Sequence, residues 1–205
     1  ASASEMSGEG KYQPQDEKHP FTPRSVYGIS KVTSHLLVKV FRESYRIYAV
    51  DGILFNHESS SGRRGEEFVT RKITKAVAGI YKAILEGNNI ESLKIGNISA
   101  KRDWSAAEDF CDGIWKMLNQ PTWETGEHGP RGLLLQPKDY VLASGETHSV
   151  QEFVELAFAE VGIKGEWSGS NPDDYFWYSS GPKSLSSNEC KLVVIDKQFY
   201  RPADV

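Results

Sequence analysis

The sequence predicts an α/β fold, because stretches with helical periodicity alternate with short, apolar, β-rich stretches. Residues 24–45 place apolar side chains at helical spacing, which predicts a core-facing helix. Residues 47–55 then have the length and composition of a buried parallel strand, although Asp51 and Gly52 interrupt it. An amphipathic helix is expected over 66–85. We therefore expect parallel strands joined by helices.

The rest of the chain continues this alternation. Strands are expected over 93–95, 140–143, 164–167 and 191–196, and helices over 107–118 and 149–161. The second of these helices opens on Ser149-Val-Gln-Glu152, the pattern of a capping box. Surface loops are expected at residues 10–23, at an insertion over 120–138, and over 168–188, where the aromatic cluster 175–178 has no explanation from the sequence.

Length and composition set broad limits on function. With 205 residues the chain can bury one substantial core or two small ones, and its hydrophobic content of 39% and net charge of −4 are those of a globular protein without a basic tract for nucleic acid. Cys111 and Cys190 lack metal-ligand spacing, so we expect neither a metal site nor a disulfide framework. No stretch has the length of a membrane span and no secretory leader is visible, so the expected location is the cytoplasm.

Tyr27 and Lys31 form the most informative pair in the chain. Residues four apart lie on one face of a helix, so the ammonium of Lys31 can reach the phenol of Tyr27. A nearby cation favours the phenolate and so lowers the barrier to using tyrosine as a base near neutral pH. The spacing alone also arises by chance in many helices, where it means only a half-buried tyrosine beside a solvated lysine.

Around this pair the sequence resembles the extended short-chain dehydrogenase/reductases, and within them the GDP-mannose 4,6-dehydratase family. The resemblance runs in family order through nearly the whole chain. It rests on Phe21-Thr-Pro-Arg-Ser-Val-Tyr27-Gly-Ile-Ser-Lys31, Phe41-Arg-Glu-Ser-Tyr45, Asp51-Gly-Ile-Leu-Phe-Asn-His-Glu-Ser59, Phe68-Val-Thr-Arg-Lys-Ile73, Gly96-Asn97, Lys101-Arg-Asp-Trp104 and Phe199-Tyr-Arg-Pro202.

The resemblance implies the C-terminal part of a Rossmann-type doubly wound parallel sheet plus a smaller α/β substrate-binding region. Residues 1–65 correspond to the latter part of the NADP-binding domain, and 66–205 mostly to the nucleotide-sugar-binding region, with some segments returning to the Rossmann sheet. The opening strand and glycine-rich turn of such a fold are not found in these residues, so we expect a partial chain that lacks the N-terminal nucleotide-binding half. The implied cofactor is NADP, and the full-length protein is expected to be a dimer or tetramer.

The implied reaction is dehydration of GDP-mannose to GDP-4-keto-6-deoxymannose, on the route to GDP-fucose. The resemblance assigns catalysis to Glu5, Tyr27 and Lys31. It assigns NADP contacts to Tyr27, Lys31, His57 and Arg64. The substrate contacts that it implies are Asn56, Val69, Lys72, Gly96, Arg102, Arg201 and Asp204. For Arg102 and Arg201 there is also a chemical reason, since a guanidinium can grip phosphate oxygens through two parallel hydrogen bonds.

Several positions depart from the family pattern. Ala3 stands where the family has a threonine whose hydroxyl faces the hexose; Ser60-Ser-Gly62 replaces a single proline; Ser105-Ala106 replaces Gly-His; and Asp204 replaces glutamate. Two functions therefore stay open. The chain belongs either to an active dehydratase or to a catalytically silent or truncated member of the family.

Overall fold

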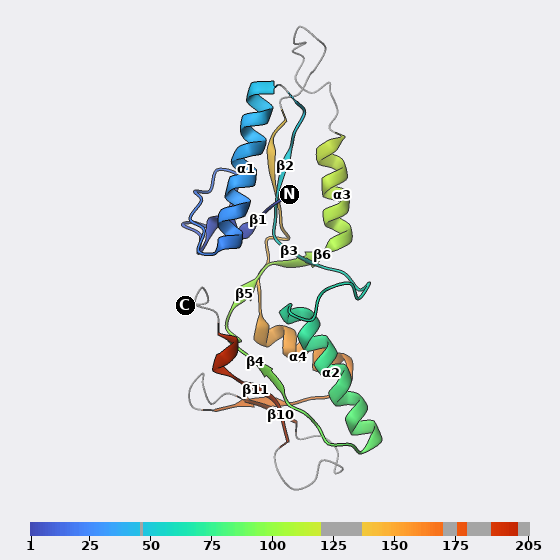
Figure 1. Ribbon diagram of the computed structural model, residues 1–205. Coiled ribbons are helices and arrows are strands. Elements are labelled where there is room, and N and C mark those ends of the chain that lie inside the picture. The colour runs from blue at the N-terminus through green and yellow to red at the C-terminus, as the bar shows by residue number, and fades with distance from the viewer. Residues whose placement is uncertain (46, 120–136, 170–175, 180–189, 201–205) are drawn as a thin grey trace. The chain divides into compact units, whose positions relative to one another are not determined.

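The computed structural model divides the chain into two compact units (Figure 1). Unit 1 comprises residues 1–60 and 103–146, and unit 2 comprises residues 61–102 and 147–205. The structure describes residues 1–45, 47–119, 137–169, 176–179 and 190–200. The insertion expected over 120–138 lies outside this part of the chain except for its last two residues.

Unit 1 is built on a parallel sheet in the order β1-β2-β7, which confirms the α/β class with parallel strands. Its strands are β1 (Ser2–Ala3), β2 (Asp51–Leu54) and β7 (Asp139–Leu142). The expected strand over 47–55 is shorter, and Asp51 and Gly52 begin it instead of interrupting it. Asp51 is only 2% exposed, and the strand tolerates this buried carboxylate because it is hydrogen-bonded inside the unit. Gly52 allows close packing, since a Cβ there would lie 3.0 Å from Met117.

Helix α1 (Val26–Tyr45) connects β1 to β2 and packs on β1. The prediction that its apolar stripe faces the core is wrong. The residues that it buries are Gly28 and His35, whereas Ile29, Leu36, Leu37, Val40 and Phe41 are each between 47% and 55% exposed. The side of the helix that meets the sheet is therefore narrow, and it includes a polar residue that hydrophobic periodicity passes over.

The second helix of unit 1, α3 (Ala107–Leu118), lies on the other side of the sheet from α1 (Figure 1). It follows β6 (Trp104–Ala106), which pairs in parallel with β3 (Asn56–Glu58). The helix itself was expected, and the face that it buries was predicted only in part. Phe110 is buried as expected and Met117 is buried as well, while Cys111, Trp115 and Leu118 of the expected face are exposed.

Unit 2 contains a mixed sheet covered by helices. Strand β4 (Leu93–Ile95) pairs in parallel with β11 (Cys190–Ile195), which pairs antiparallel with β10 (Phe176–Ser179), and β10 pairs antiparallel with β9 (Glu166–Ser168). The amphipathic helix α2 (Val69–Glu86) buries Ile73, Val77 and Ile80 as expected, and ends at Gly87 with φ of 67°. Glycine suits this left-handed cap because it carries no Cβ.

The remaining elements of unit 2 are short or well capped. Strands β5 (Lys101–Arg102) and β8 (His148–Ser149) pair antiparallel and lead into α4 (Val150–Glu160). The capping box is confirmed, because Ser149 Oγ accepts the Glu152 backbone N–H at 3.1 Å and the Glu152 carboxylate accepts the Ser149 N–H at 2.6 Å. Among the described residues no helix is long and apolar enough to cross a membrane.

Three of the four aromatic residues assigned to a polar loop, Phe176, Trp177 and Tyr178, instead form part of the sheet, and Tyr175 lies outside the described residues. In β10, Trp177 is 2% exposed and its ring stacks on Phe158 of α4 at 4.4 Å between centroids. Burying rings of this size stabilises the unit by about 2 kcal/mol each. Trp177 therefore belongs to the core of unit 2, and the polar residues around this strand hid it from prediction.

Candidate functional site

Tyr27 and Lys31 lie together at the start of α1. The Lys31 ammonium is 5.4 Å from the centroid of the Tyr27 ring, and the tyrosine is 52% exposed. Ser25 Oγ accepts the Gly28 backbone N–H at 2.9 Å, which caps this end of the helix. The end of the helix that carries the pair is thus held by a capping hydrogen bond, and the Tyr27 phenol is accessible from solvent, as a tyrosine that acts on a bound substrate must be.

Glu5 comes to the same end of α1 from the neighbouring segment. It lies in the 3-10 helix η1 (Ser4–Ser7), directly after β1, and its side chain is exposed. The close packing of η1 on α1 depends on Gly28, since a Cβ there would lie 2.8 Å from the Glu5 carbonyl oxygen. The structure therefore places the segment of the expected acid-base residue against the helix of the expected tyrosine.

His57 and Asn56 follow β2 on strand β3, at the carboxyl end of the sheet, where open α/β sheets bind ligands. The His57 Nδ1–H donates to the Phe55 carbonyl at 2.8 Å and the ring stacks on Phe110. Because Nδ1 donates, the neutral ring offers Nε2 as an acceptor for a ligand hydroxyl. The Ser105-Ala106 departure does not disturb this region, since both residues pair with β3.

In unit 2, Lys72 and Gly96 meet around Phe199, which the sequence reasoning did not single out as a site residue. The Lys72 ammonium lies 3.3 Å from the Phe199 ring centroid, and a Cβ on Gly96 would lie 2.5 Å from the Phe199 carbonyl oxygen. Burial lowers the pKa of Lys72, and the charge of Asp196 partly opposes that shift. In the sequence, the only signal for Phe199 was its position directly before Tyr200 and Arg201 in the stretch that resembles the family.

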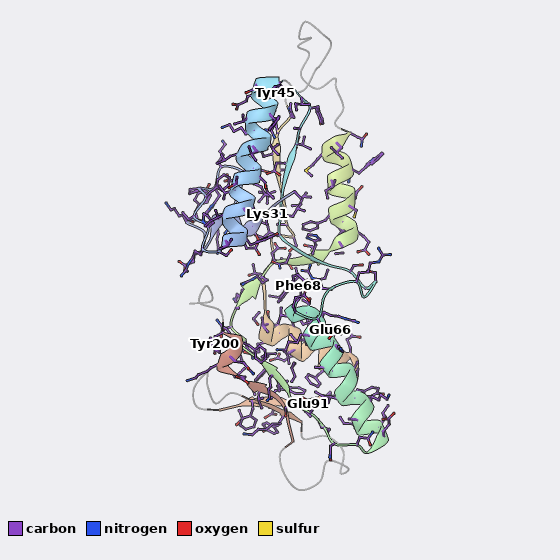
Figure 2. The ribbon with its side chains drawn as sticks, in the orientation of Figure 1. Lys31, Tyr45, Glu66, Phe68, Glu91 and Tyr200 are labelled. Carbon is purple, nitrogen blue, oxygen red and sulfur yellow. The ribbon has the colours of Figure 1, made fainter. Side chains whose placement is uncertain are left out.

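Lys72 and Phe199 border an open groove of about 530 Å³. Its lining includes Lys72, Lys75, Lys94, Glu66, Glu91 and Phe199. Glu66 lies just before α2 and Glu91 beyond its far end (Figure 2). The Lys75 ammonium is paired with Glu66, which leaves Lys72 and Lys94 beside the aromatic ring of Phe199, and this combination suits a ligand that carries phosphate and a planar nucleobase.

The other expected contacts in unit 2 are more scattered. Val69 is the first residue of α2 and is half-buried. Arg64 lies over the Phe68 ring, 3.9 Å from its centroid, and Arg102 is exposed on β5. Arg201 and Asp204 fall outside the described residues.

Solved structures of low sequence identity share the fold of this chain. RMD from Pseudomonas aeruginosa, complexed with NADPH, superposes with a TM-score of 0.65 at 18% identity, over 95% of this chain and 52% of that one. The dTDP-glucose 4,6-dehydratase from Bacillus anthracis, in complex with NAD, gives a TM-score of 0.59 at 20% identity, over 78% and 44% of the two chains.

Sequence comparison shows the family of the chain. The GDP-mannose 4,6 dehydratase family profile matches residues 1–205, and the human GDP-mannose 4,6 dehydratase is 40% identical over 210 residues. The chain belongs to the GDP-mannose 4,6-dehydratase family. That alignment covers all of this chain and 48% of the human protein, so the chain spans about half the length of the relative it matches.

Proposed function

We propose that this chain supplies catalytic and substrate-binding residues for the dehydration of GDP-mannose to GDP-4-keto-6-deoxymannose, the first step towards GDP-fucose. The observation that carries the proposal is the Tyr27–Lys31 pair, with the Lys31 ammonium 5.4 Å from the exposed Tyr27 ring and the Glu5 segment packed on the same helix end. Membership of the family supports the choice of substrate.

The residues present fit an NADP cofactor. The Tyr27 ring is accessible, Lys31 offers ammonium hydrogens to ribose hydroxyls, and His57 offers Nε2 as an acceptor. Arg64, whose guanidinium lies over Phe68, is the proposed phosphate contact. When bound, NADP supplies the hydride acceptor for C4 of the hexose and the hydride donor for C6.

Each remaining step has a residue of this chain. Tyr27 takes the proton of the C4 hydroxyl as phenolate, and the charge of Lys31 favours that phenolate. The resulting 4-ketone acidifies the C5 proton, which Glu5 removes and gives to the departing C6 hydroxyl, so that water leaves. The proton that Tyr27 accepted accounts for the proton that C5 regains, so both residues return to their starting states and loss of water is the net change.

Substrate binding is proposed for the residues that the resemblance implies. Lys72 and Gly96, together with Phe199, form the part with the clearest structural support, because they meet beside the groove of unit 2. Asn56, Val69, Arg102, Arg201 and Asp204 complete the proposed set. Residues 1–65 are proposed as the latter part of the NADP-binding domain and 66–205 as mostly the nucleotide-sugar region. We also propose a cytoplasmic homo-oligomer at full length.

The test uses the chain expressed with the flanking sequence of its own gene, to the length of its relatives; we call this the extended chain. Tyr27→Phe is expected to abolish turnover of GDP-mannose while NADP affinity changes by no more than about threefold, because only the hydroxyl takes part in proton transfer. Near-normal turnover in this variant would remove Tyr27 from the mechanism. Absence of turnover in the unmutated extended chain would favour a catalytically silent family member, which Ala3 already suggests as the alternative.

A further inference from the structure

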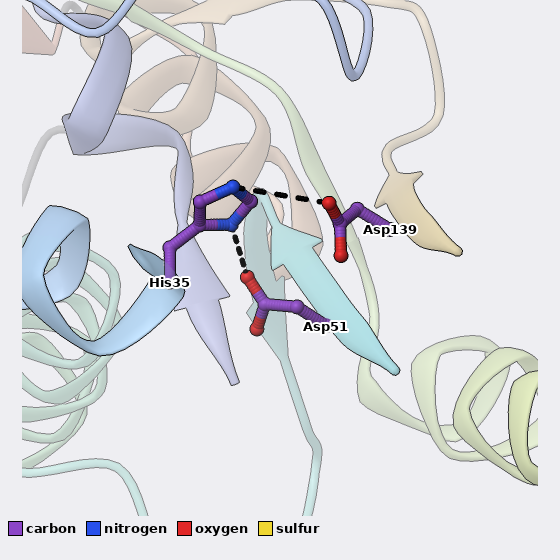
Figure 3. Close-up of side chains that lie close together, drawn as sticks. All are labelled: His35, Asp51 and Asp139. Atoms are coloured by element: carbon purple, nitrogen blue, oxygen red, sulfur yellow. Dashed lines mark hydrogen bonds and ion pairs between the residues drawn. The ribbon is translucent and has the colours of Figure 1, made fainter. Parts of the chain in front are cut away.

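A buried polar cluster ties α1 to the sheet of unit 1. His35 of α1, 6% exposed, has its Nδ1 2.6 Å from a carboxylate oxygen of Asp51 and its Nε2 3.8 Å from Asp139 (Figure 3). The same Asp51 oxygen accepts a hydrogen bond from Ser2 Oγ at 2.5 Å, and Arg42 donates to Asp139 at 2.6 Å. The cluster thus joins one helix to all three strands of the sheet.

The two carboxylates occupy directly paired positions. Asp51 and Asp139 are partners in the parallel register of β2 and β7, and like charges side by side on neighbouring strands repel. The imidazole ring of His35 lies between them, with one nitrogen towards each acid (Figure 3). A metal ion binds one nitrogen of an imidazole, so an ion shared by both acids would have to displace the ring from this place. The geometry therefore indicates that these side chains hold α1 against the sheet and do not bind a metal ion.

The buried polar cluster contacts the same face of α1 that bears Tyr27 and Lys31. Tyr27, Lys31 and His35 are spaced four residues apart and so lie along one face of α1. The Lys31 ammonium donates to the Ala1 carbonyl at 3.0 Å, while Ser2 reaches the cluster through Asp51. The chain is therefore bonded to this face directly at Ala1, just before β1, and through Asp51 at Ser2, the first residue of β1, shortly before η1 and Glu5.

We propose that His35 is a positioning residue, which holds Tyr27 and Lys31 in register with Glu5 by fixing α1 against β1 through Asp51. This role rests on the proposed function of those three residues. It predicts a loss of rate and not of substrate affinity, because no residue of the cluster is among those proposed to bind the nucleotide sugar. A shift of about 1 Å between reacting groups lowers rates by about 10²-fold.

The experiment compares His35→Phe with His35→Asn in the extended chain. Phenylalanine fills the ring volume without any hydrogen bond, whereas the asparagine side-chain N–H₂ can replace Nδ1 as the donor to Asp51. We expect His35→Phe to lower kcat by about tenfold or more with KM for GDP-mannose changed less than about threefold, and His35→Asn to restore most of kcat. Amide hydrogen exchange of residues 2–5 should be faster in His35→Phe, with the exchange of α2 unchanged.

The outcomes separate this role from general stability and from the reaction itself. A lower melting temperature with kcat unchanged, or a raised KM with kcat unchanged, overturns the proposal. If His35→Phe does not fold, Ser2→Ala replaces it, since that variant removes only the strand-side hydrogen bond to Asp51, and an unchanged kcat there is equally contrary. If the unmutated extended chain has no turnover, the proposed function fails. Exchange of residues 2–5 then decides alone: unchanged exchange in His35→Phe overturns the positioning role.

Discussion

Replacing Ala3 by threonine tests whether this chain lacks one hydroxyl donor of its family. Ala3 has no hydroxyl to offer the hexose, and Ser2 next to it donates to Asp51 at 2.5 Å. Removing one preorganised donor from an active site costs about 10²–10³ in kcat, which is ~2.7–4 kcal/mol. Ala3→Thr in the extended chain is therefore expected to raise kcat within that range and to change KM less, because the hydroxyl acts on charge that develops in the transition state.

The same substitution should weaken the fold. Ala3 is 6% exposed, and enlarging a side chain in a packed site typically costs about 1–3 kcal/mol of folding free energy. Ala3→Val is the matched control, since valine adds the same volume without a hydroxyl. Both variants should melt at a lower temperature than the unmutated protein, and only the threonine variant should gain rate.

The assay measures kcat and KM for formation of the 4-keto product, together with the melting temperature of each variant. Equal rates for the threonine and valine variants would refute the reasoning, as would a threonine variant no faster than the unmutated chain. Another donor would then serve this lineage. Ser4, the half-buried first residue of η1, would be the next to test, by Ser4→Ala.

Three further predictions concern unit 2. Gly96→Ala should lower both stability and GDP-mannose binding, measured by melting and titration, because its Cβ would meet a backbone carbonyl at 2.5 Å. Ser149→Ala should cost about 0.5–2 kcal/mol of unfolding free energy. The reciprocal hydrogen bond from the Ser149 N–H lowers the pKa of Glu152, so its stabilising effect should be present at neutral pH and be lost as acid titration protonates Glu152, which pH-dependent melting would detect. Lys72→Met should raise KM by about tenfold or more, as a charge-assisted hydrogen bond is worth about 1.5–3 kcal/mol; Lys75→Met, whose ammonium is paired with Glu66, should change KM by no more than about twofold.

Much of the fold follows from patterns that the sequence displays locally. The capping box at Ser149, the stripe of α2 and the apolar strand β11 were all predictable, because caps, helical periodicity and β-branched runs act over a few residues. The Tyr27–Lys31 pair was predictable for the same reason, since both groups lie on one helix.

What escaped prediction depends on contacts between distant segments. Asp51 looked like an interruption of a strand, and only its hydrogen bonds to Ser2 and His35 explain why a carboxylate begins β2. Trp177 looked like part of a polar loop until its pairing in β10 and its stacking on Phe158 placed it in the core. Phe199 joins Lys72 only through the fold of unit 2. Periodicity carries no information about such partners.

The pairing of Asp51 with Asp139 also bears on the order in which unit 1 assembles. The chain leaves unit 1 after residue 60 and returns at residue 103, so β2 has to wait for β7 until more than eighty further residues have been synthesised. Two aspartates at paired positions oppose the meeting of these strands, and Arg42 and His35 offset that repulsion only once α1 has docked. Docking of α1 should therefore precede closure of the sheet on the ribosome, and substitutions at Arg42 should slow folding more than they accelerate unfolding.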